Sequence, residues 1–388
     1  MRIYLDHNAT TPVDQGVADA MHAAVRACFG NASSVHSFGQ AAKAALDDAR
    51  SAVADLLGAR PNDVIFTGSG TEADNLAIRG VAEAARPGGR GHLIASSIEH
   101  EAVLNTLKAL SKRGWTCTLL PAGPAGVVSP ADLEAAITDE TALVSVMHAN
   151  NEIGTLQPVA KLAAIAHGRG ALFHTDAVQT AGKLPLDVTA LGVDLLSISA
   201  HKFNGPKGVG ALWIRRGTRL VAPLTGGRQE RNRRAGTENV PAIVGLGVAA
   251  GLAGRKLVQE AARLGALRDR LESALLERIP DTTVNGDGDR VPNTTNISFH
   301  GIEAEALLIA LDLEGIAVST GSACSSGTLE PSHVLRAMGL TPRRAQSSIR
   351  FSLGLGNTAD EVERVVEALP RLVDKLRALS RTGAHAHA

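Results

Sequence analysis

The chain has 388 residues, with 39 basic and 39 acidic side chains, so its formal net charge is zero. This balance removes the bulk-charge argument for a protein that binds polyanions such as nucleic acid. Only three cysteines occur, at Cys28, Cys117 and Cys324, and their wide spacing excludes a disulfide framework and a zinc motif of the CxxC type. The length and the 44% hydrophobic fraction fit a globular protein with two domains.

The N-terminal segment MRIYLDHNATTP has no basic region followed by an apolar run, which a secretory signal would need. No stretch approaches about 18 consecutive apolar residues, so we expect no membrane span. Together with the few cysteines, these features favour a cytoplasmic protein.

Short apolar runs rich in β-branched residues recur along the first part of the chain and predict strands. They cover residues 64–66, 93–95, 143–147, 171–173, 195–198 and 211–214. Alanine-rich segments with helical periodicity lie between several of them, as at residues 72–86 and 101–112. The runs do not alternate between apolar and polar residues, which predicts an α/β fold with a largely parallel sheet buried on both faces. Ligands of such sheets bind at the carboxyl ends of the strands.

The pattern becomes helical from about residue 240, with an amphipathic stretch over residues 256–278, and the following segment DTTVNGDGDRVPN predicts turns. A second unit then shows strands near residues 295–299 and 349–353, helices over 303–313 and 359–379, and a glycine- and serine-rich loop over 319–327. We therefore expect a large domain over residues 14–258. Residues 1–13 and 259–388 would form a small domain that carries the loop.

The segment FTGSGTEADN, after the first strand, predicts an anion site. Gly70 and Thr71 lead into a helix, whose exposed amide groups and positive end attract a phosphate. The letters GSGTEA also fit the GxGxxA fingerprint of a dinucleotide site, with Glu99 as the acid for the ribose. A NAD-dependent dehydrogenase is therefore an alternative, although it rests on this segment alone.

Two later strands are followed by an acid and a lysine that can bind one cofactor together. Asp176 and Gln179 follow one run in HTDAVQ, and Ser199, His201 and Lys202 follow the next in SISAHKFNGPKGVG. Pyridoxal phosphate needs a lysine amine to hold its aldehyde as a Schiff base, and a carboxylate to keep its ring nitrogen protonated. Seen singly, each residue fits a solvated loop, but their joint occurrence predicts a pyridoxal phosphate site.

Three more polar residues follow strands. His100 lies in SSIEHE, and Asn150 and Asn151 lie in MHANNEIG. From the residues alone, a helix cap for the histidine and a turn for the asparagines remain open.

The motifs, taken together, resemble a known family. In the family's order they are YLDHNATTP, FGNASSVHSFG, TGSGTEADN, EHEAV, MHANNEIG, HTDAVQ, SAHKFNGPKGVG, RRAGTEN, STGSACSSGTLEPSHVLRAMG and SIRFSLG. The chain resembles the cysteine desulfurases of the NifS and IscS type, in the aminotransferase class V family of fold type I pyridoxal phosphate enzymes. Ala32 is a small departure, because the family usually has proline there. The resemblance implies a large, mainly parallel seven-stranded sheet domain and a smaller α/β domain.

The resemblance also implies roles around the cofactor. Lys202 would be the Schiff-base lysine and Asp176 the partner of the pyridinium nitrogen. His100 would stack on the ring, and Gln179 and Asn151 would lie near the ring hydroxyl group. The residues that would hold the phosphate are Gly70, Thr71, Ser199 and His201.

Two further positions follow from the resemblance. Thr237 would reach the phosphate from the opposite subunit of a homodimer, within a basic segment that contains Arg228, Arg231, Arg233 and Arg234. A loop that crosses the subunit interface is favoured there over a nucleic-acid patch. Arg350 would bind the substrate α-carboxylate through its guanidinium fork, with a salt bridge to an acidic neighbour as the alternative.

The implied activity converts L-cysteine to L-alanine. Lys202 would remove the Cα proton, and the thiolate of Cys324 would take the substrate sulfur as a persulfide, with His100 handling protons nearby. An exposed loop such as GSACSSG suits a thiol that must reach sulfur and then carry it outward. Cys28 and Cys117 are expected to be packing residues.

The implied partners are L-cysteine and a sulfur acceptor or iron–sulfur scaffold protein, with no membrane and no direct nucleic acid. Residue spacing predicts no metal site, although Cys324 could contact an iron–sulfur cluster transiently. A selenocysteine lyase or another class V enzyme remains an alternative. A non-catalytic sulfur carrier or scaffold-binding protein is a further one, which the joint presence of Lys202, Asp176, Arg350 and Cys324 opposes.

Overall fold

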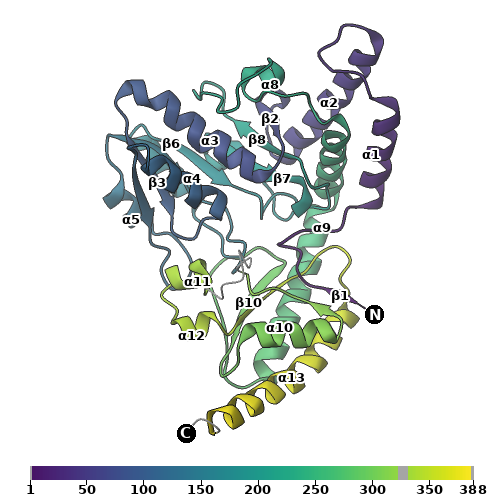
Figure 1. The fold of residues 1–388 in the computed structure, drawn as a ribbon, viewed down its shortest axis with the longest axis vertical. Coiled ribbons are helices and arrows are strands. Elements are labelled where there is room, and N and C mark those ends of the chain that lie inside the picture. Colours follow the sequence, from purple (N-terminus) through teal and green to yellow (C-terminus); the bar gives the residue numbers. More distant parts are fainter. Residues whose placement is uncertain (1, 322–330, 386–388) are drawn as a thin grey trace.

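The structure is a computed structural model that describes residues 2–321 and 331–385, so Cys324 and most of the loop over 319–327 lie outside the described residues. Its main feature is a seven-stranded sheet in the order β2-β8-β7-β6-β5-β3-β4 (Figure 1). The strands are β2 (Val64–Thr67), β3 (His92–Ser96), β4 (Thr116–Leu120), β5 (Thr141–Ser145), β6 (Leu172–Asp176), β7 (Leu195–Ser199) and β8 (Gly210–Ile214). Only β8 runs antiparallel to its neighbours. The predicted α/β fold with a mainly parallel sheet is confirmed.

Helices cover both faces of this sheet because its strands send alternate apolar side chains to opposite sides. Ile65 packs with helices α3 (Gly70–Ala85) and α4 (Glu101–Ser111), whereas Val64 and Phe66 pack on the other face. The longer helices that contribute to that second face include α1 (Gln15–Ala27), α2 (Ser37–Leu56), α5 (Pro130–Ala136), α6 (Val159–Gly168) and α9 (Val240–Arg278). The sheet is therefore buried between two apolar layers.

A second core lies around a three-stranded antiparallel sheet in the order β12-β10-β9. Its strands are β9 (Thr282–Val284), β10 (Thr294–Phe299) and β12 (Ser348–Ser352), and helices α10 (Ala304–Leu313) and α13 (Ala359–His385) pack with it. β1 (Ile3–Tyr4) pairs in parallel with β11 (Ile316–Ala317), which ties the N-terminal segment to this unit. The prediction of turns throughout residues 281–293 is wrong at β9, because its backbone pairs with β10 as an edge strand.

Helix α9 runs from the large unit into the small one (Figure 1). Its first turns, including Leu246, pack in the core of the large sheet, and Leu264, Leu271 and Leu275 pack in the second core. Among the described helices, it alone is long and apolar enough to cross a membrane by length and composition, and 44% of its most apolar window is buried inside the protein. The change of core along α9 supports the predicted domain division near residue 258, which stays a prediction.

Two strand ends differ from the sequence prediction. β5 ends at Ser145 because Met147 donates its N–H to the Glu99 carboxylate and not to a neighbouring strand. β6 continues to Asp176 because His174, although polar, is satisfied inside the sheet by Ser145 and Ser197. The acid predicted to follow a strand is therefore its last residue.

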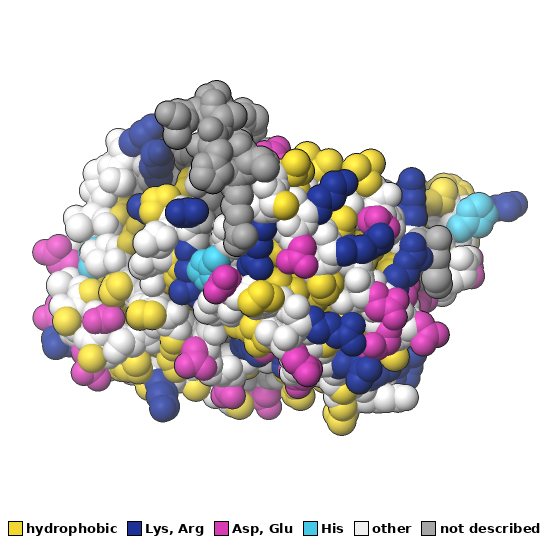
Figure 2. All heavy atoms as spheres, turned by 90° about the horizontal axis from the view of Figure 1, so that it is seen from below, with side chains coloured by type: hydrophobic (Ala, Val, Ile, Leu, Met, Phe, Trp, Pro, Cys, Tyr) yellow, Lys and Arg dark blue, Asp and Glu magenta, His cyan; other side chains and the backbone are white. Residues whose placement is uncertain are grey.

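The remaining elements are short. They are the helices α7 (Val188–Leu191), α8 (Gln229–Asn232), α11 (His333–Ala337) and α12 (Pro342–Ala345), and 3-10 turns at Pro61–Asp63, Arg86–Gly88 and Ala200–Lys202. Figure 2 shows one face of the molecule, on which basic and acidic side chains are interspersed. This agrees with the zero net charge and shows no large area of one sign on that face.

Candidate active site

A cavity of about 520 Å³ opens at the carboxyl ends of β5, β6 and β7, where an α/β sheet is expected to bind its ligand. It brings together all but two of the predicted site residues: Gly70, Thr71, His100, Asn151, Asp176, Gln179, Ser199, His201, Lys202 and Arg350. Thr237 does not line the cavity of its own chain, and Cys324 lies outside the described residues.

The N-terminus of α3 forms one end of the cavity. Ser69 caps the helix by accepting a hydrogen bond from the N–H of Glu72 at 3.0 Å. The N–H groups of Gly70 and Thr71 are in the first turn, where no intrahelical acceptor is available, so they can bind an anion. A Cβ atom on Gly70 would lie 3.2 Å from the Cβ atom of Ser199, so glycine permits the close approach of helix and strand. This is a concave, positively polarised end suited to a phosphate.

Asp176 lies beneath the cavity and is nearly buried, with 6% of its surface exposed. One oxygen accepts a hydrogen bond from the N–H of Val178 at 2.8 Å. Burial raises the pKa of this carboxyl group, while the nearby charges of His100 and Lys202 oppose the shift. A cationic ring nitrogen placed against Asp176 would supply the charge that a buried carboxylate lacks.

His100 caps a helix and also lines the cavity. It precedes α4, and its Nδ1 atom accepts a hydrogen bond from the N–H of Ala102 at 3.1 Å, so it caps the helix. It also lines the cavity and is exposed. The cap fixes the imidazole at the mouth of the site without removing it from the cavity.

Lys202 follows β7 in a tight turn and points to the N-terminal segment. Its Nζ atom donates hydrogen bonds to the carbonyl oxygens of Asn8, at 2.6 Å, and Ala9, at 2.9 Å. Burial and the charge of Arg350 lower its pKa to about 8, against the opposing effect of Asp176. About a tenth of this amine is therefore unprotonated at pH 7 and about half at pH 8, far more than for an ordinary lysine, and this form can act as a nucleophile or base.

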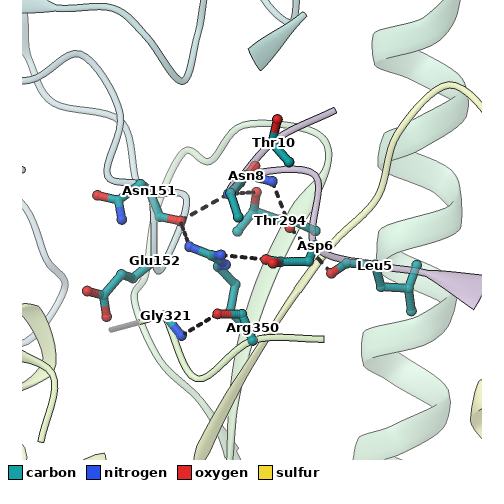
Figure 3. A network of polar contacts seen from close by, with 12 residues as sticks. Leu5, Asp6, Asn8, Thr10, Asn151, Glu152, Thr294, Gly321 and Arg350 are labelled. Atoms are coloured by element: carbon teal, nitrogen blue, oxygen red, sulfur yellow. Dashed lines mark hydrogen bonds and ion pairs between the residues drawn. The ribbon is translucent and has the colours of Figure 1, made fainter. Parts of the chain in front are cut away.

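Arg350, in β12, faces the cavity from the small unit (Figure 3). It forms an ion pair with Asp6 at 2.6 Å and donates to the carbonyl oxygen of Asn151 at 3.0 Å. The salt bridge that the sequence left as an alternative is thus present. It does not exclude the substrate role, because the guanidinium remains a cavity wall and a substrate carboxylate has the same chemistry as Asp6.

Three carboxylate and amide side chains that line the cavity have no role predicted from the sequence: Asp6, Asn8 and Asp74. The first two belong to the motif YLDHNATTP, which carried the resemblance but suggested no individual role. Asp74 could have been found, because it follows Gly70 by four residues and so lies on the same side of α3. It is 1% exposed, and burial together with Asp176 raises its pKa well above the usual range.

Other predicted features lie away from the cavity. Thr237 is exposed in the loop before α9. In the basic segment around it, Arg231 donates to Asn62 and Arg234 pairs with Glu72, so these two arginines support the loop. Glu99 is completely buried and bonded to Ser96, which leaves it no access to a ribose and removes the structural basis of the dehydrogenase alternative.

The two described cysteines are both partly buried. Cys28 packs against the large core. Cys117 donates to the carbonyl oxygen of Leu107 at 3.5 Å, and burial raises the pKa of its thiol. Neither lines the cavity, and no group of three or more potential metal ligands occurs among the described residues.

Comparison with known families identifies the chain. Residues 3–365 match the family described as aminotransferase class-V. The chain belongs to this family. Its curated relatives include "Cysteine desulfurase IscS" of Dictyoglomus turgidum, which is 49% identical over 97% of this chain and 96% of the relative. "Cysteine desulfurase" of Nostoc sp. is 51% identical over 97% of this chain and 94% of the relative. The predicted family resemblance is confirmed.

Solved structures agree with this assignment. One titled "NIFS-LIKE PROTEIN" has a TM-score of 0.91 and 39% identity, and the match covers 97% of this chain and 100% of that one. Another, "SspA in complex with cysteine", has a TM-score of 0.81 and 36% identity over 91% of this chain and 99% of that one. The fold and the family thus rest on full-length likeness.

The residues present fit pyridoxal phosphate. A helix N-terminus with a glycine that admits close approach suits the phosphate, and Lys202 supplies an amine with a lowered pKa for the aldehyde. Asp176 is a buried carboxyl group with no ion-pair partner recorded among the described residues, which suits a protonated ring nitrogen. The phosphate, the aldehyde and the ring nitrogen of the cofactor therefore each have a chemical counterpart in one cavity.

Proposed function

We propose that this protein is a cysteine desulfurase that uses pyridoxal phosphate in the cavity at the ends of β5, β6 and β7. The observation that carries the proposal is the meeting of Lys202 and Asp176 at neighbouring strand ends with Arg350 across the same cavity. The names of the relatives, at about half identity over nearly the whole chain, support the same activity.

The large unit would hold the cofactor. Gly70, Thr71, Ser199 and His201 would bind the phosphate, Asp176 would keep the ring nitrogen protonated, and His100 would lie against the ring. Gln179 and Asn151 would lie near the ring hydroxyl group. When bound, the cofactor supplies an electron sink that acidifies the Cα–H bond of an attached amino acid.

Lys202 would have two roles in the reaction. It would hold the cofactor aldehyde, and after release by the substrate amine it would remove the Cα proton. Burial and a neighbouring guanidinium favour its unprotonated form, which both roles require. Its position beside the carbonyl oxygens of Asn8 and Ala9 gives the protonated amine acceptors between these steps.

Arg350 would orient the substrate. The carboxylate of L-cysteine would exchange with the Asp6 carboxylate on the guanidinium, while the carbonyl oxygen of Asn151 keeps one N–H of the arginine in place. This exchange replaces one charge-assisted hydrogen bond by another. Because the guanidinium binds a carboxylate, we expect the site to favour amino acids with a free α-carboxylate over simple thiols.

Cys324 would accept the sulfur. Its thiolate would attack the sulfur atom of the bound substrate and form a persulfide bond. The electron pair of the broken Cβ–Sγ bond would go to the carbon side, which takes up protons and leaves as L-alanine. His100 would exchange protons near the thiol. The persulfide would then pass to an iron–sulfur scaffold protein or another sulfur acceptor, with a transient iron–sulfur contact at Cys324.

The proposed assembly is a homodimer in the cytoplasm. Thr237, exposed on its own chain, would complete the phosphate site of the opposite subunit. The division into a large domain over residues 14–258 and a small domain over 1–13 and 259–388 would let the two walls of the site move relative to each other. The change of core along α9 supports this division.

A Cys324→Ser variant tests the activity. With L-cysteine and a thiol reductant, the native protein should release L-alanine and sulfide in equal amounts. The variant should bind the cofactor as the native protein does but lose nearly all sulfide release. Cys28→Ser is the matched control, because that cysteine packs away from the cavity and should leave turnover unchanged.

Sulfide release that survives in Cys324→Ser would overturn the sulfur-acceptor role. Native protein without cofactor or turnover would instead support a non-catalytic carrier. Running the assay with L-selenocysteine distinguishes a cysteine desulfurase from a selenocysteine lyase, which would turn over selenocysteine but not cysteine.

A further inference from the structure

Lys183 is a buried cation that the proposed mechanism does not use. It follows β6 by seven positions and is 9% exposed. Its Nζ atom donates hydrogen bonds to two amide oxygens, Oδ1 of Asn8 at 3.0 Å and Oε1 of Gln179 at 2.9 Å. No carboxylate in the described part of the chain forms an ion pair with it. Burial, together with Lys202 and Arg350, lowers its pKa well below the usual range.

A buried amine without a counter-ion stabilises a fold poorly. Lys183 also lies behind the candidate site. It lines a separate, smaller cleft along α9, whereas its partners Asn8 and Gln179 line the large cavity. Lys202 borders both spaces. The hydrogen bonds of Lys183 therefore connect it to the wall of the large cavity through its two amide partners.

The orientation of Gln179 follows from its neighbours. Its Nε2 atom donates to the carbonyl oxygen of Asn8 at 3.1 Å, and a carbonyl can only accept. Oε1 must therefore face Lys183, which donates to it whether the amine is charged or neutral. Without the Lys183 donor, Oε1 of Gln179 would lose this hydrogen bond inside the protein, which costs free energy. The native orientation of the amide would then be less favoured over a rotated one.

Asn8 is fixed in the same way. Its Nδ2 atom donates to the carbonyl oxygen of Asn151 at 3.0 Å and to the Thr294 hydroxyl at 2.8 Å (Figure 3). Its Oδ1 atom is left to accept from Lys183 and from Asn293. The backbone carbonyl of Asn8 meanwhile accepts from Lys202. The same residue thus contacts the proposed reactive amine and the carbonyl group that holds Arg350.

We propose that Lys183 is a positioning residue for this site: by donating to both amides, it fixes Gln179 and Asn8, and through them the surroundings of Lys202 and Arg350. The proposal rests on the proposed function, since it concerns the cofactor and substrate of that site. The class of ligand served is an amino acid attached to pyridoxal phosphate.

Lys183→Met and Lys183→Gln test the proposal on the protein loaded with pyridoxal phosphate. Methionine matches the length of lysine but has no N–H donor, whereas glutamine keeps donors. In Lys183→Met, the pH at which the bound cofactor changes its absorption should shift by about one unit, and KM for L-cysteine should rise roughly tenfold. Lys183→Gln should restore part of both changes. Lys256→Met is the matched control, because that lysine is exposed on the wall of the smaller cleft and should change neither.

The midpoint of thermal unfolding without cofactor separates positioning from stability. We expect it to change little in Lys183→Met, because removing a buried amine without a counter-ion opposes the loss of its two hydrogen bonds. A Lys183→Met protein with native absorption titration and native KM would overturn the proposal, as would a lower unfolding midpoint as its only change. Native protein that takes up no cofactor would contradict the proposed function itself.

Discussion

Two nearly buried aspartates, Asp176 and Asp194, lie at opposite ends of neighbouring strands in the same sheet. Asp176 ends β6, and Asp194 immediately precedes the parallel neighbour β7, so one is at the carboxyl edge and the other at the amino edge. Asp176 accepts one backbone hydrogen bond and faces the cavity. Asp194 accepts from the N–H of Phe173 and pairs with His167 and Arg215.

The contrast separates two uses of a buried carboxyl group. Asp194 is surrounded by donors supplied by the fold, so its charge is matched within the protein. Asp176 is only partly matched, and burial raises its pKa. A cationic ligand would stabilise the charged form of such a buried carboxyl group, and a protonated cofactor ring is a ligand of this kind. Activity should depend on the first aspartate and stability on the second.

Asp176→Asn should have the largest effect. The side chain keeps its shape but can no longer hold the cofactor's ring nitrogen in the protonated form, so kcat for alanine release should fall by about a hundredfold or more. The free energy of unfolding should not fall, because a poorly matched buried carboxyl group is removed. Steady-state kinetics and denaturant unfolding of the same preparation check both parts. Native kcat would show that the carboxylate has no such role.

Arg350→Lys should mainly raise KM for L-cysteine, by roughly 10- to 100-fold, because an ammonium cannot bind a carboxylate bidentately. Arg50→Lys is the matched control. Arg50 is also buried and pairs with Glu230, but it lies away from the cavity. It should lower stability and leave KM unchanged. Equal effects of both variants on KM would argue against carboxylate binding at Arg350.

Asp194→Asn should lower the free energy of unfolding by about 1–3 kcal/mol, since His167 and Arg215 lose a charged acceptor. That change corresponds to about 5- to 160-fold in the unfolding equilibrium. Urea unfolding measures it. With cofactor bound, kcat and KM should stay within about twofold of the native values. A loss of activity without a loss of stability would remove the contrast between the two aspartates.

The pH dependence of cofactor attachment should show the lowered pKa of Lys202, about 8. Only the unprotonated amine can attack the aldehyde, so attachment is slow below pH 8, where the ammonium dominates, and reaches a plateau above it. The rate should rise about tenfold between pH 7 and pH 9. Mixing cofactor-free protein with pyridoxal phosphate and following the absorption measures this rate. A rise centred above pH 10 would show an ordinary lysine.

The sequence predicted the parts of the site that follow strands. Lys202 and Asp176 could be placed because buried apolar runs locate strands and the motifs locate the polar residues after them. It could not place Arg350 against Asp6, or Lys183 against Asn8, because these contacts join residues far apart in the chain. The continuous passage of α9 through both cores was likewise beyond local periodicity, which shows where a helix is but not what it packs against.

Covalent trapping of the cofactor measures whether Lys202 holds its aldehyde. The protein loaded with pyridoxal phosphate is reduced with borohydride, digested and mapped by mass spectrometry. We expect a pyridoxyl group on the Lys202 peptide of the native protein and of Lys183→Met, and none on this peptide in Lys202→Ala. A pyridoxyl group found only on other lysines, or none on any lysine, would show that Lys202 does not hold the cofactor.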